Sequence, residues 1–353
     1  MQKGKLFFAL ISIGLLFFCG KFSNSPYPFP EMNFFPKMPT SLANPVTVEG
    51  AAIGRFLFYD PILSLDSTIS CSSCHNQKSA FSDSPNLFSS GINGQKTVRN
   101  AMSLCNLAWS PSYFYDGRAR NLEDQIAHPI TAKNEMNMEW NILLSKLNSS
   151  KFYLKKFKSL YRTSKIDSVQ VKNVIAQFLR TLISHESNFD KVLTGKRKFT
   201  EDERKGLLLV TNQTRGDCLH CHPSDGNALL TTMKFSNNGL DSIYNADEYK
   251  DKGRGAITGN KSDNGKFRIP SLRNIVLTAP YMHDGRFKTL EEVLEFYSTG
   301  VHMSANIDTK MGFAYQKGVK LNAEEKKEII AFLNTLTDSV FISKKEFSNP
   351  FVK

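Results

Sequence analysis

Hydrophobic side chains recur at helical spacing over much of the chain. Residues 168–189 contain no proline or glycine and carry apolar side chains at this spacing, which predicts an amphipathic helix. Residues 289–300 begin with a Thr-x-x-Glu capping box and end at glycine, and residues 322–338 begin with an asparagine cap and acids in the first turn, so both predict helices. We therefore expect a mainly α fold, with long irregular stretches at 76–100 and 223–270.

Candidate chemistry is concentrated in two copies of the pattern C-x-x-C-H. The copies consist of Cys71, Cys74 and His75, and of Cys218, Cys221 and His222. On a helical turn, positions i, i+3 and i+4 share a face, so the two cysteines can bond to the vinyl groups of a haem while the histidine reaches its iron. The motifs therefore indicate two covalently bound haem c groups.

Other uses of cysteine explain this pattern less well. Disulfides are common in exported proteins, and two cysteine pairs can make a four-ligand zinc site. Neither accounts for a histidine directly after each pair. A thioredoxin-like redox pair would need a nearby βαβ pattern, which we do not find. We interpret His220 as a spacer within the second motif and Cys105 as a buried apolar cysteine.

The spacing of the two motifs suggests two cytochrome c-like haem domains. The second motif follows the first after nearly half the chain. We expect an N-terminal haem domain at 45–195, a C-terminal haem domain at 196–343 and a short tail at 344–353, with the boundary near 193–203. The irregular stretches would wrap the haem edges.

The N-terminus indicates export. Residues 1–19 have the layout of a signal peptide, because two lysines precede an apolar run from Leu6 to Phe18 that is short for a membrane span. Cys19 follows this run as a lipoprotein cysteine does, although Phe18 stands where a small residue is expected. A lipid anchor at Cys19 and loss of Cys19 with the leader both stay open. Residues 20–44, rich in proline and serine, are expected to form an extended tether or arm, in a protein that is periplasmic and either free or membrane-anchored.

The chain is basic, with 45 Lys and Arg against 33 Asp and Glu and a formal net charge of +12. No dense basic run interleaved with aromatic residues accompanies this excess, so it is only weak evidence for nucleic-acid binding, and we expect no nucleic-acid partner. Haem propionates, an acidic redox partner or an anionic surface are better explanations of the charge.

Several segments outside the haem motifs also carry recognisable sequence patterns. The chain contains SSGINGQKTVRNAMSLCN, FYDGRARNLEDQIAHPI, FLRTLIS and FRIPSLRNIVLTAPYMHDGRFKTLEEVLEFYSTG, in this order. With the two haem motifs, they make the region from Pro45 to Val340 similar to the bacterial di-haem cytochrome c peroxidases and their MauG-like relatives.

This resemblance implies that peroxide reacts at the N-terminal haem. Many members cover that iron with a histidine from the S-x-G-x-x-G segment, but the matching position here is Ile92. The resemblance thus implies an open iron that needs no reductive activation, unless His128 covers it. The acid–base glutamate of the family matches Glu135, and a nearby glutamine matches Gln125.

The FYDGR segment is implied to lie near both haems. Phe114 and Tyr115 match a pair that the family usually writes Phe-Trp, and the tryptophan eases electron transfer between the haems. Tyrosine is also oxidisable, so transfer can persist, although hole hopping through tryptophan is in doubt. Arg118 would lie close to the haems, where it could pair with a propionate.

The second haem would take His222 as its proximal ligand and serve as the electron entry point. The sixth ligand matches Tyr297, as in MauG-like members, with Met282, Met303 and Met311 as alternatives. The resemblance also implies a calcium ion between the haems. Its ligands would be the side-chain oxygen of Asn100 and the backbone carbonyls of Thr278 and Pro280.

Three functions remain open. The first is a peroxidase that reduces hydrogen peroxide to water with electrons from a small soluble cytochrome or cupredoxin. The second is MauG-like oxidation of a protein or organic substrate by peroxide, and the third is a non-enzymatic di-haem electron carrier. A homodimer is implied by the resemblance alone.

Overall fold

The computed structural model describes residues 24–352. The expected signal peptide at 1–19, with Cys19, lies outside this range. No helix within the range is long and apolar enough to cross a membrane.

Helices and loops make up almost all of the molecule, which confirms the mainly α prediction. The helices of the first half are α1 (Val48–Tyr59), α2 (Cys71–Cys74), α3 (Leu122–Thr131), α4 (Trp140–Ser149), α5 (Lys151–Tyr161) and α6 (Ser168–Thr181). Those of the second half are α7 (Asn188–Leu193), α8 (Glu201–Thr211), α9 (Gly255–Thr258), α10 (Leu290–Glu295) and α11 (Ala323–Asn334). Two short antiparallel strands, β1 (Phe235–Ser236) and β2 (Phe267–Arg268), form the only named sheet of the described chain.

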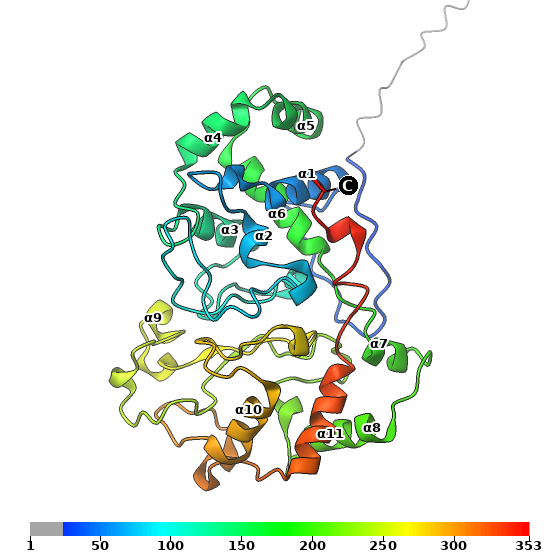
Figure 1. Cartoon of the computed structure of the whole chain (residues 1–353), viewed down its shortest axis with the longest axis vertical. Helices are drawn as coiled ribbons and strands as arrows, with labels where there is room; N and C mark the ends of the chain where they lie inside the picture. The colour runs from blue at the N-terminus through cyan, green and yellow to red at the C-terminus, as the bar shows by residue number, and fades with distance from the viewer. Residues whose placement is uncertain (1–23, 353) are drawn as a thin grey trace, which may run out of the picture.

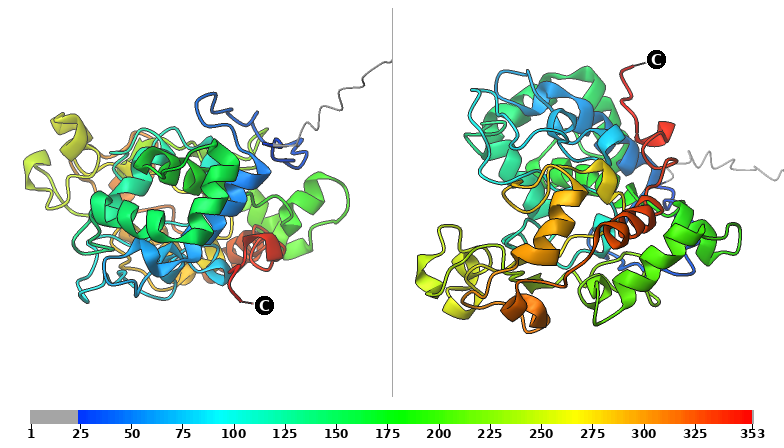
Figure 2. Two further views of the ribbon diagram at one scale, coloured as in Figure 1. Left: turned by 90° about the horizontal axis from the view of Figure 1, so that it is seen from above. Right: turned by 60° about the horizontal axis from the view of Figure 1, so that its bottom comes forward.

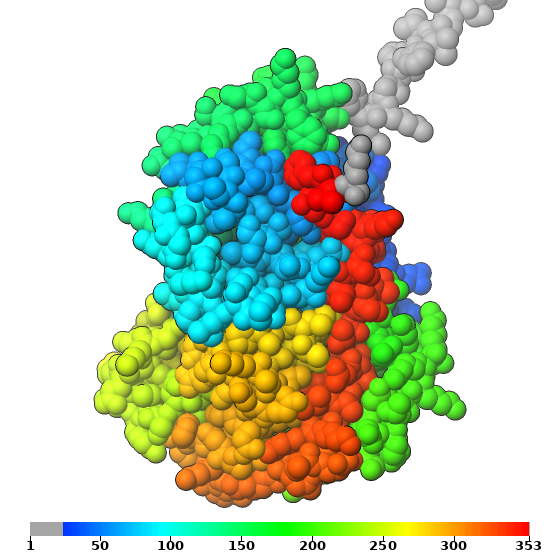
Figure 3. Space-filling view, viewed as in Figure 1, coloured from blue at the N-terminus to red at the C-terminus, as the bar shows by residue number. Residues whose placement is uncertain are grey.

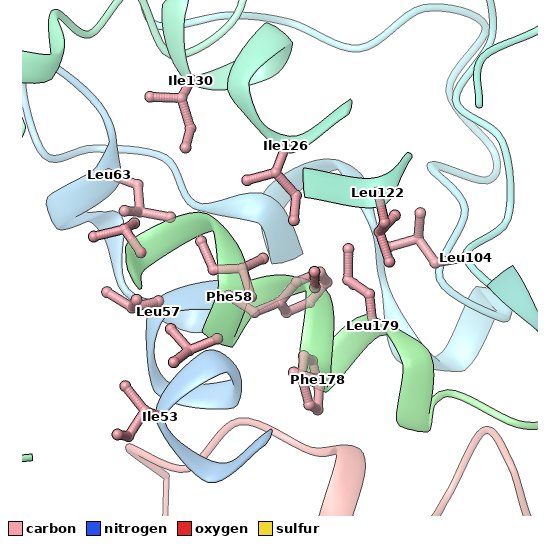
Figure 4. Packing of buried hydrophobic residues seen from close by; sticks show 14 of the residues in the cluster. Ile53, Leu57, Phe58, Leu63, Leu104, Leu122, Ile126, Ile130, Phe178 and Leu179 are labelled. Carbon is pink, nitrogen blue, oxygen red and sulfur yellow. The ribbon is translucent and has the colours of Figure 1, made fainter. Parts of the chain in front are cut away.

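The elements form two stacked bodies (Figures 1 and 2). The first contains α1 to α6 and the second contains α8 to α11. In the first body α1 packs across α6, and Figure 4 shows Leu57, Phe58 and Phe178 from these helices meeting in the core. Gly54 permits this crossing, because a Cβ there would lie 1.9 Å from the backbone oxygen of Val174.

The second body repeats this packing. Helix α8 crosses α11, and a Cβ on Gly206 would lie 2.0 Å from the backbone oxygen of Glu328. Phe332 of α11 is fully buried, as is Phe178 of α6 in the first body. An equivalent pair of crossed helices, α1 with α6 and α8 with α11, thus supports each C-x-x-C-H motif.

An asparagine ends the long helix of each half. Asn106 donates its backbone N–H to the Leu182 carbonyl, 2.9 Å away, and accepts the Ser184 N–H on its side-chain oxygen at 2.8 Å. Asn274 makes the matching bonds with Leu336 and Asp338, at 3.1 and 2.8 Å. The prediction of one helix over 168–189 was therefore wrong at its end, because the backbone after Thr181 bonds to Asn106 instead.

Both ends of the described chain connect the two bodies. Residues 24–44 are extended, and the Phe34 carbonyl accepts the Ala228 N–H at 2.9 Å while the Pro36 carbonyl accepts Trp109 Nε1–H at 2.8 Å. After α11 the chain returns to the first body, where Phe341 and Phe347 are buried in its core. Figure 3 shows this last segment running along one edge of the molecule.

Candidate active site

The first pocket surrounds the motif at α2. Its wall contains Cys71, Cys74 and His75 among apolar side chains such as Phe58 and Leu179. His75 donates its Nδ1–H to the Phe81 carbonyl at 2.8 Å, which leaves Nε2 as the free ring nitrogen. Burial lowers the pKa of His75, so its imidazole is neutral and suited to bind a metal.

The second pocket has the same arrangement. Cys218, Cys221 and His222 line it, and His222 donates Nδ1–H to the Leu230 carbonyl at 3.2 Å. Burial lowers the pKa of His222 to about 4. Each pocket therefore offers two thiols and one neutral imidazole with a free Nε2, inside an apolar lining, which is the donor set that a covalently bound haem c requires.

Glu135 and Gln125 lie in the first pocket, as expected. Both side chains contribute to its wall, Gln125 from α3 and Glu135 from the turn that follows α3. Burial raises the pKa of Glu135, and the positive charge of Arg118 opposes this shift. A buried carboxyl group with a raised pKa is suited to accept and return a proton.

The segment with Ile92 holds the turn of Glu135 in place. The Ile92 backbone N–H donates to the Glu135 carbonyl at 3.0 Å. Gly91 makes this approach possible, because a Cβ there would lie 2.3 Å from the Asn134 carbonyl oxygen. His75 is the one histidine that lines this pocket in the described chain, whereas the exposed His128 packs its ring against Phe114 at 5.2 Å.

Replacing Gly91 with alanine is expected to lower peroxide turnover by about 10- to 100-fold, because the new Cβ must displace the turn that carries Glu135. Haem content should stay unchanged. Gly312→Ala is the control, since a Cβ at Gly312 meets nothing within 4 Å, its φ is not positive, and the residue lies outside this loop. Steady-state peroxide turnover is measured for both variants. Equal activities would show that the loop does not position Glu135.

Phe114, Tyr115 and Arg118 lie where the two bodies meet. The Arg118 guanidinium lies over the Phe114 ring at 3.4 Å and forms an ion pair with Asp116 at 3.0 Å. Arg254 of the second body donates to the Asp116 carbonyl at 3.1 Å. This segment therefore forms part of the contact between the two halves.

Tyr115 reaches the second pocket and meets His283 there. Both residues line that pocket, and their rings are nearly perpendicular with centroids 6.5 Å apart. His283 stacks on Phe267 at 3.6 Å, and Arg99 lies over the same Phe267 ring at 5.5 Å. Aromatic side chains from both bodies thus meet on the wall of the second pocket, where the two bodies are in contact. Burial raises the pKa of Tyr115, so its phenol is neutral.

Our sequence reasoning missed His283, although an internal repeat identifies it. The segment SLCNLAWSPSYFYDGR (103–118) aligns without gaps on SLRNIVLTAPYMHDGR (271–286), and this places Tyr115 opposite His283. The backbones agree, because Phe114 and Met282 both have positive φ, at 68° and 73°. The repeat explains why each half contributes one ring to the junction.

Tyr297 lies inside the second pocket, on the π-helical turn Phe296–Gly300 that follows α10. Asn238 donates Nδ2–H to its phenol oxygen at 2.9 Å. Burial raises the pKa of Tyr297 to about 12. Of the alternative ligands, Met282 and Met311 line the same pocket, whereas Met303 is 48% exposed and is not part of its wall.

Asn100 lies at the junction of the two bodies. Its backbone N–H donates to the His283 carbonyl at 2.9 Å, and its side-chain amide donates to the carbonyls of Asn86 and Leu87 at 3.3 and 3.0 Å. The Thr278 hydroxyl donates to the Ile275 carbonyl at 3.1 Å, and Pro280 lies in the same loop. Within residues 24–352, no group of three or more His, Cys, Asp or Glu side chains forms a metal site.

Two haem-binding pockets, one in each body, define a di-haem c-type cytochrome. Comparison with known proteins assigns the family. The family model described as "Di-haem cytochrome c peroxidase" matches residues 48–198. The chain is 32% identical to "Methylamine utilization protein MauG" of Methylorubrum extorquens over 85% of its length and 81% of that protein. It is 33% identical to "Cytochrome c551 peroxidase" of Nitrosomonas europaea, over 86% and 84% of the two chains.

A solved structure supports the same assignment. A "MauG-like protein associated with microbial copper homeostasis" aligns with a TM-score of 0.84 and 33% identity, covering 92% of this chain and 99% of that one. The chain belongs to the di-haem cytochrome c peroxidase family, in which MauG proteins are relatives. The family implies two c-type haems, and both pockets contain the residues to hold them.

Proposed function

We propose that this protein reduces hydrogen peroxide to water with electrons from a small soluble cytochrome or cupredoxin. The observation that carries the proposal is a buried acid–base group, Glu135, in the pocket that also contains Cys71, Cys74 and His75. A carrier of electrons alone has no use for a buried carboxyl group in its haem pocket.

The pocket residues divide the work of peroxide cleavage. Cys71, Cys74 and His75 would hold a haem c, which would supply redox-active iron in this pocket. Glu135 accepts the proton of the near peroxide oxygen and returns it to the leaving oxygen, so that water departs instead of hydroxide. Gln125 offers an amide that can orient peroxide beside Glu135, and the nearby Arg118 keeps the carboxylate form accessible.

The second pocket and the junction supply electrons. Cys218, Cys221 and His222 would hold the haem that supplies the entry point for donor electrons, and Tyr115 and His283, which line the same pocket at the contact between the bodies, are the aromatic side chains that could assist transfer to the first haem. The proposal is tested by mixing peroxide with reduced cytochrome c or cupredoxin and the haem-loaded protein. Catalytic donor oxidation supports a peroxidase, whereas stoichiometric exchange of electrons alone would identify a carrier.

A MauG-like reaction is the second candidate, in which peroxide oxidises a protein or organic substrate. Tyr297 favours it, because a phenolate ligand is a hard anionic donor that stabilises oxidised iron and lowers its potential. Peroxide consumption without donor oxidation, together with a modified substrate, would favour this second candidate.

Replacing Tyr297 with phenylalanine is expected to abolish any phenolate-to-iron charge-transfer band of the second haem and to raise that haem's midpoint potential. The physical reason is the loss of an anionic oxygen ligand. Resonance Raman spectroscopy and potentiometry measure the two effects. Tyr281→Phe is the matched control, since Tyr281 lines the same pocket but donates its hydroxyl to the Ile275 carbonyl. Unchanged spectra in Tyr297→Phe would place the ligand elsewhere, with Met282 and Met311 the nearest candidates.

Calcium binding at the junction and export complete the proposal. The Asn100 amide hydrogens bond to backbone carbonyls, so its side-chain oxygen is the atom available to a cation, with the carbonyls of Thr278 and Pro280 as further ligands.

Export follows from the leader-like residues 1–19 and from the need to attach haem c outside the cytoplasm. A lipid anchor at Cys19 and a homodimer remain further parts of this proposal.

A further inference from the structure

Helix α5 presents an unusually basic outer surface. Residues 151–166 contain six Lys and Arg and no acidic residue. Tyr153, Phe157 and Leu160 are buried against the first body, and the exposed Lys151, Lys155 and Lys158 follow one another at helical spacing on the opposite side. No carboxylate lies within 4 Å of these three lysines in the part of the chain that the structure describes. Like charges at this spacing repel one another, so this stripe weakens the isolated helix.

Exposed aromatic side chains lie beside the lysine stripe. Phe152 of α5 is 43% exposed and Phe351 near the C-terminus is 51% exposed. Both rings pack on Phe56 of α1, with centroids 5.1 and 5.4 Å from it. The Lys156 ammonium lies over the rings of Phe56 and Phe152, at 4.4 and 4.7 Å. The result is a surface of cations around aromatic rings, which we call the α5 face; its residues are Lys151, Phe152, Lys155, Lys156, Lys158 and Phe351.

The position of the α5 face indicates its partner. Figure 1 shows α5 at the upper end of the molecule, far from α10 and α11 around the second pocket. An electron donor bound at the α5 face would therefore be remote from the proposed entry point for electrons. The described chain also begins near this end, where the Ser25 N–H donates to Glu49 at the start of α1 at 3.1 Å. Five residues lie between Cys19 and Ser25, and these six residue steps span at most about 20 Å when extended.

We propose that the α5 face binds an anionic phospholipid membrane. The lysines would lie at the level of the phosphate groups, and Phe152 and Phe351 would enter the boundary between headgroups and acyl chains. In this orientation the second body points away from the membrane and stays accessible to soluble electron donors. The face would also strengthen attachment through a lipid at Cys19, because one acyl chain plus a basic surface binds far more firmly than the chain alone.

Vesicle binding tests this proposal without reference to peroxide chemistry. The haem-loaded protein is exported behind a cleavable leader in place of residues 1–19, so that it carries no acyl group. Its binding to mixed phosphatidylcholine–phosphatidylglycerol vesicles is compared with binding to phosphatidylcholine alone. We expect binding to the mixed vesicles only, weakened by salt.

Two triple variants locate the contact. Because one lysine beside an anionic bilayer strengthens binding by roughly fivefold, the combination Lys151→Gln, Lys155→Gln and Lys158→Gln should weaken vesicle binding on the order of 100-fold. The control combination, Lys196→Gln, Lys198→Gln and Lys250→Gln, removes the same charge from exposed lysines of the second half and should bind as the parent does. Phe152→Ser should further reduce the binding that remains at high salt.

Three outcomes would overturn the proposal. Equal weakening by both triple variants would mean that net charge alone acts. No vesicle binding by the parent protein, with tight binding to an RNA oligonucleotide, would identify a nucleic-acid surface. No vesicle binding together with an α5-dependent complex with an acidic cytochrome would identify a donor site.

Discussion

Replacing Glu135 with glutamine is expected to lower peroxide turnover by about 100- to 1,000-fold while both haems remain attached. Glutamine keeps the size and hydrogen-bonding capacity of the side chain but cannot accept a proton. The peroxide proton must then leave without a positioned base. Steady-state rates with a reduced donor, compared with covalent haem content, measure the effect.

The pH profile separates this acid–base role from a structural one. Burial raises the pKa of Glu135, so the proton-accepting carboxylate is lost as pH falls through a value above the usual glutamate range. The parent protein should therefore lose kcat/KM on the acid side, and Glu135→Gln should lack this limb. Glu139→Gln, an exposed glutamate at the start of α4, is the matched control. A Glu135→Gln variant with normal turnover would remove Glu135 from the mechanism.

Removing both cysteines of the second motif is expected to abolish donor-driven turnover. Cys218→Ala combined with Cys221→Ala leaves one covalent haem, at the first pocket, and deprives the protein of its electron entry point. Mass spectrometry and the haemochrome spectrum count the haems, and donor oxidation should fall to the background rate. Cys105→Ala is the control, because Cys105 lies apart from both pockets and accepts a hydrogen bond from Asn274.

The reciprocal variant makes this test directional. Cys71→Ala with Cys74→Ala should retain a haem that a donor reduces, but peroxide should no longer reoxidise it rapidly. If the variant without the second haem kept full donor-driven turnover, the division of labour between the two pockets would be wrong.

The haem sites could be predicted from the sequence because short segments determine them by themselves. Each C-x-x-C-H motif contains both haem-attachment cysteines and the iron-ligating histidine within five consecutive residues, so the haem sites can be recognised from local sequence alone. Glu135 and Gln125 were predicted through the family resemblance, and the structure places both in the pocket of His75. His75 is the only histidine of the described chain that lines this pocket, and the open iron remains a prediction.

Features that depend on distant contacts were not predicted. The helix pattern at 168–189 continues past Thr181, but hydrogen bonds to Asn106 end the helix there. The Ile92 N–H donates to the Glu135 carbonyl, and side-chain patterns do not reveal such a backbone contact. The ring contact between Tyr115 and His283 depends on how the two repeated segments face each other in the fold. The repeat is visible in the sequence, but the contact between its two copies is not.

Stopped-flow mixing of peroxide with the fully oxidised, haem-loaded protein tests the central claim most directly. No pre-reduction is applied, and a reduced cytochrome is added after the first reaction. The account predicts rapid changes of the Soret band followed by oxidation of the donor, because no histidine of the described chain beyond His75 lines the first pocket. A reaction that begins only after one haem is reduced would contradict the account, since it would require a protein ligand that leaves the first iron on activation.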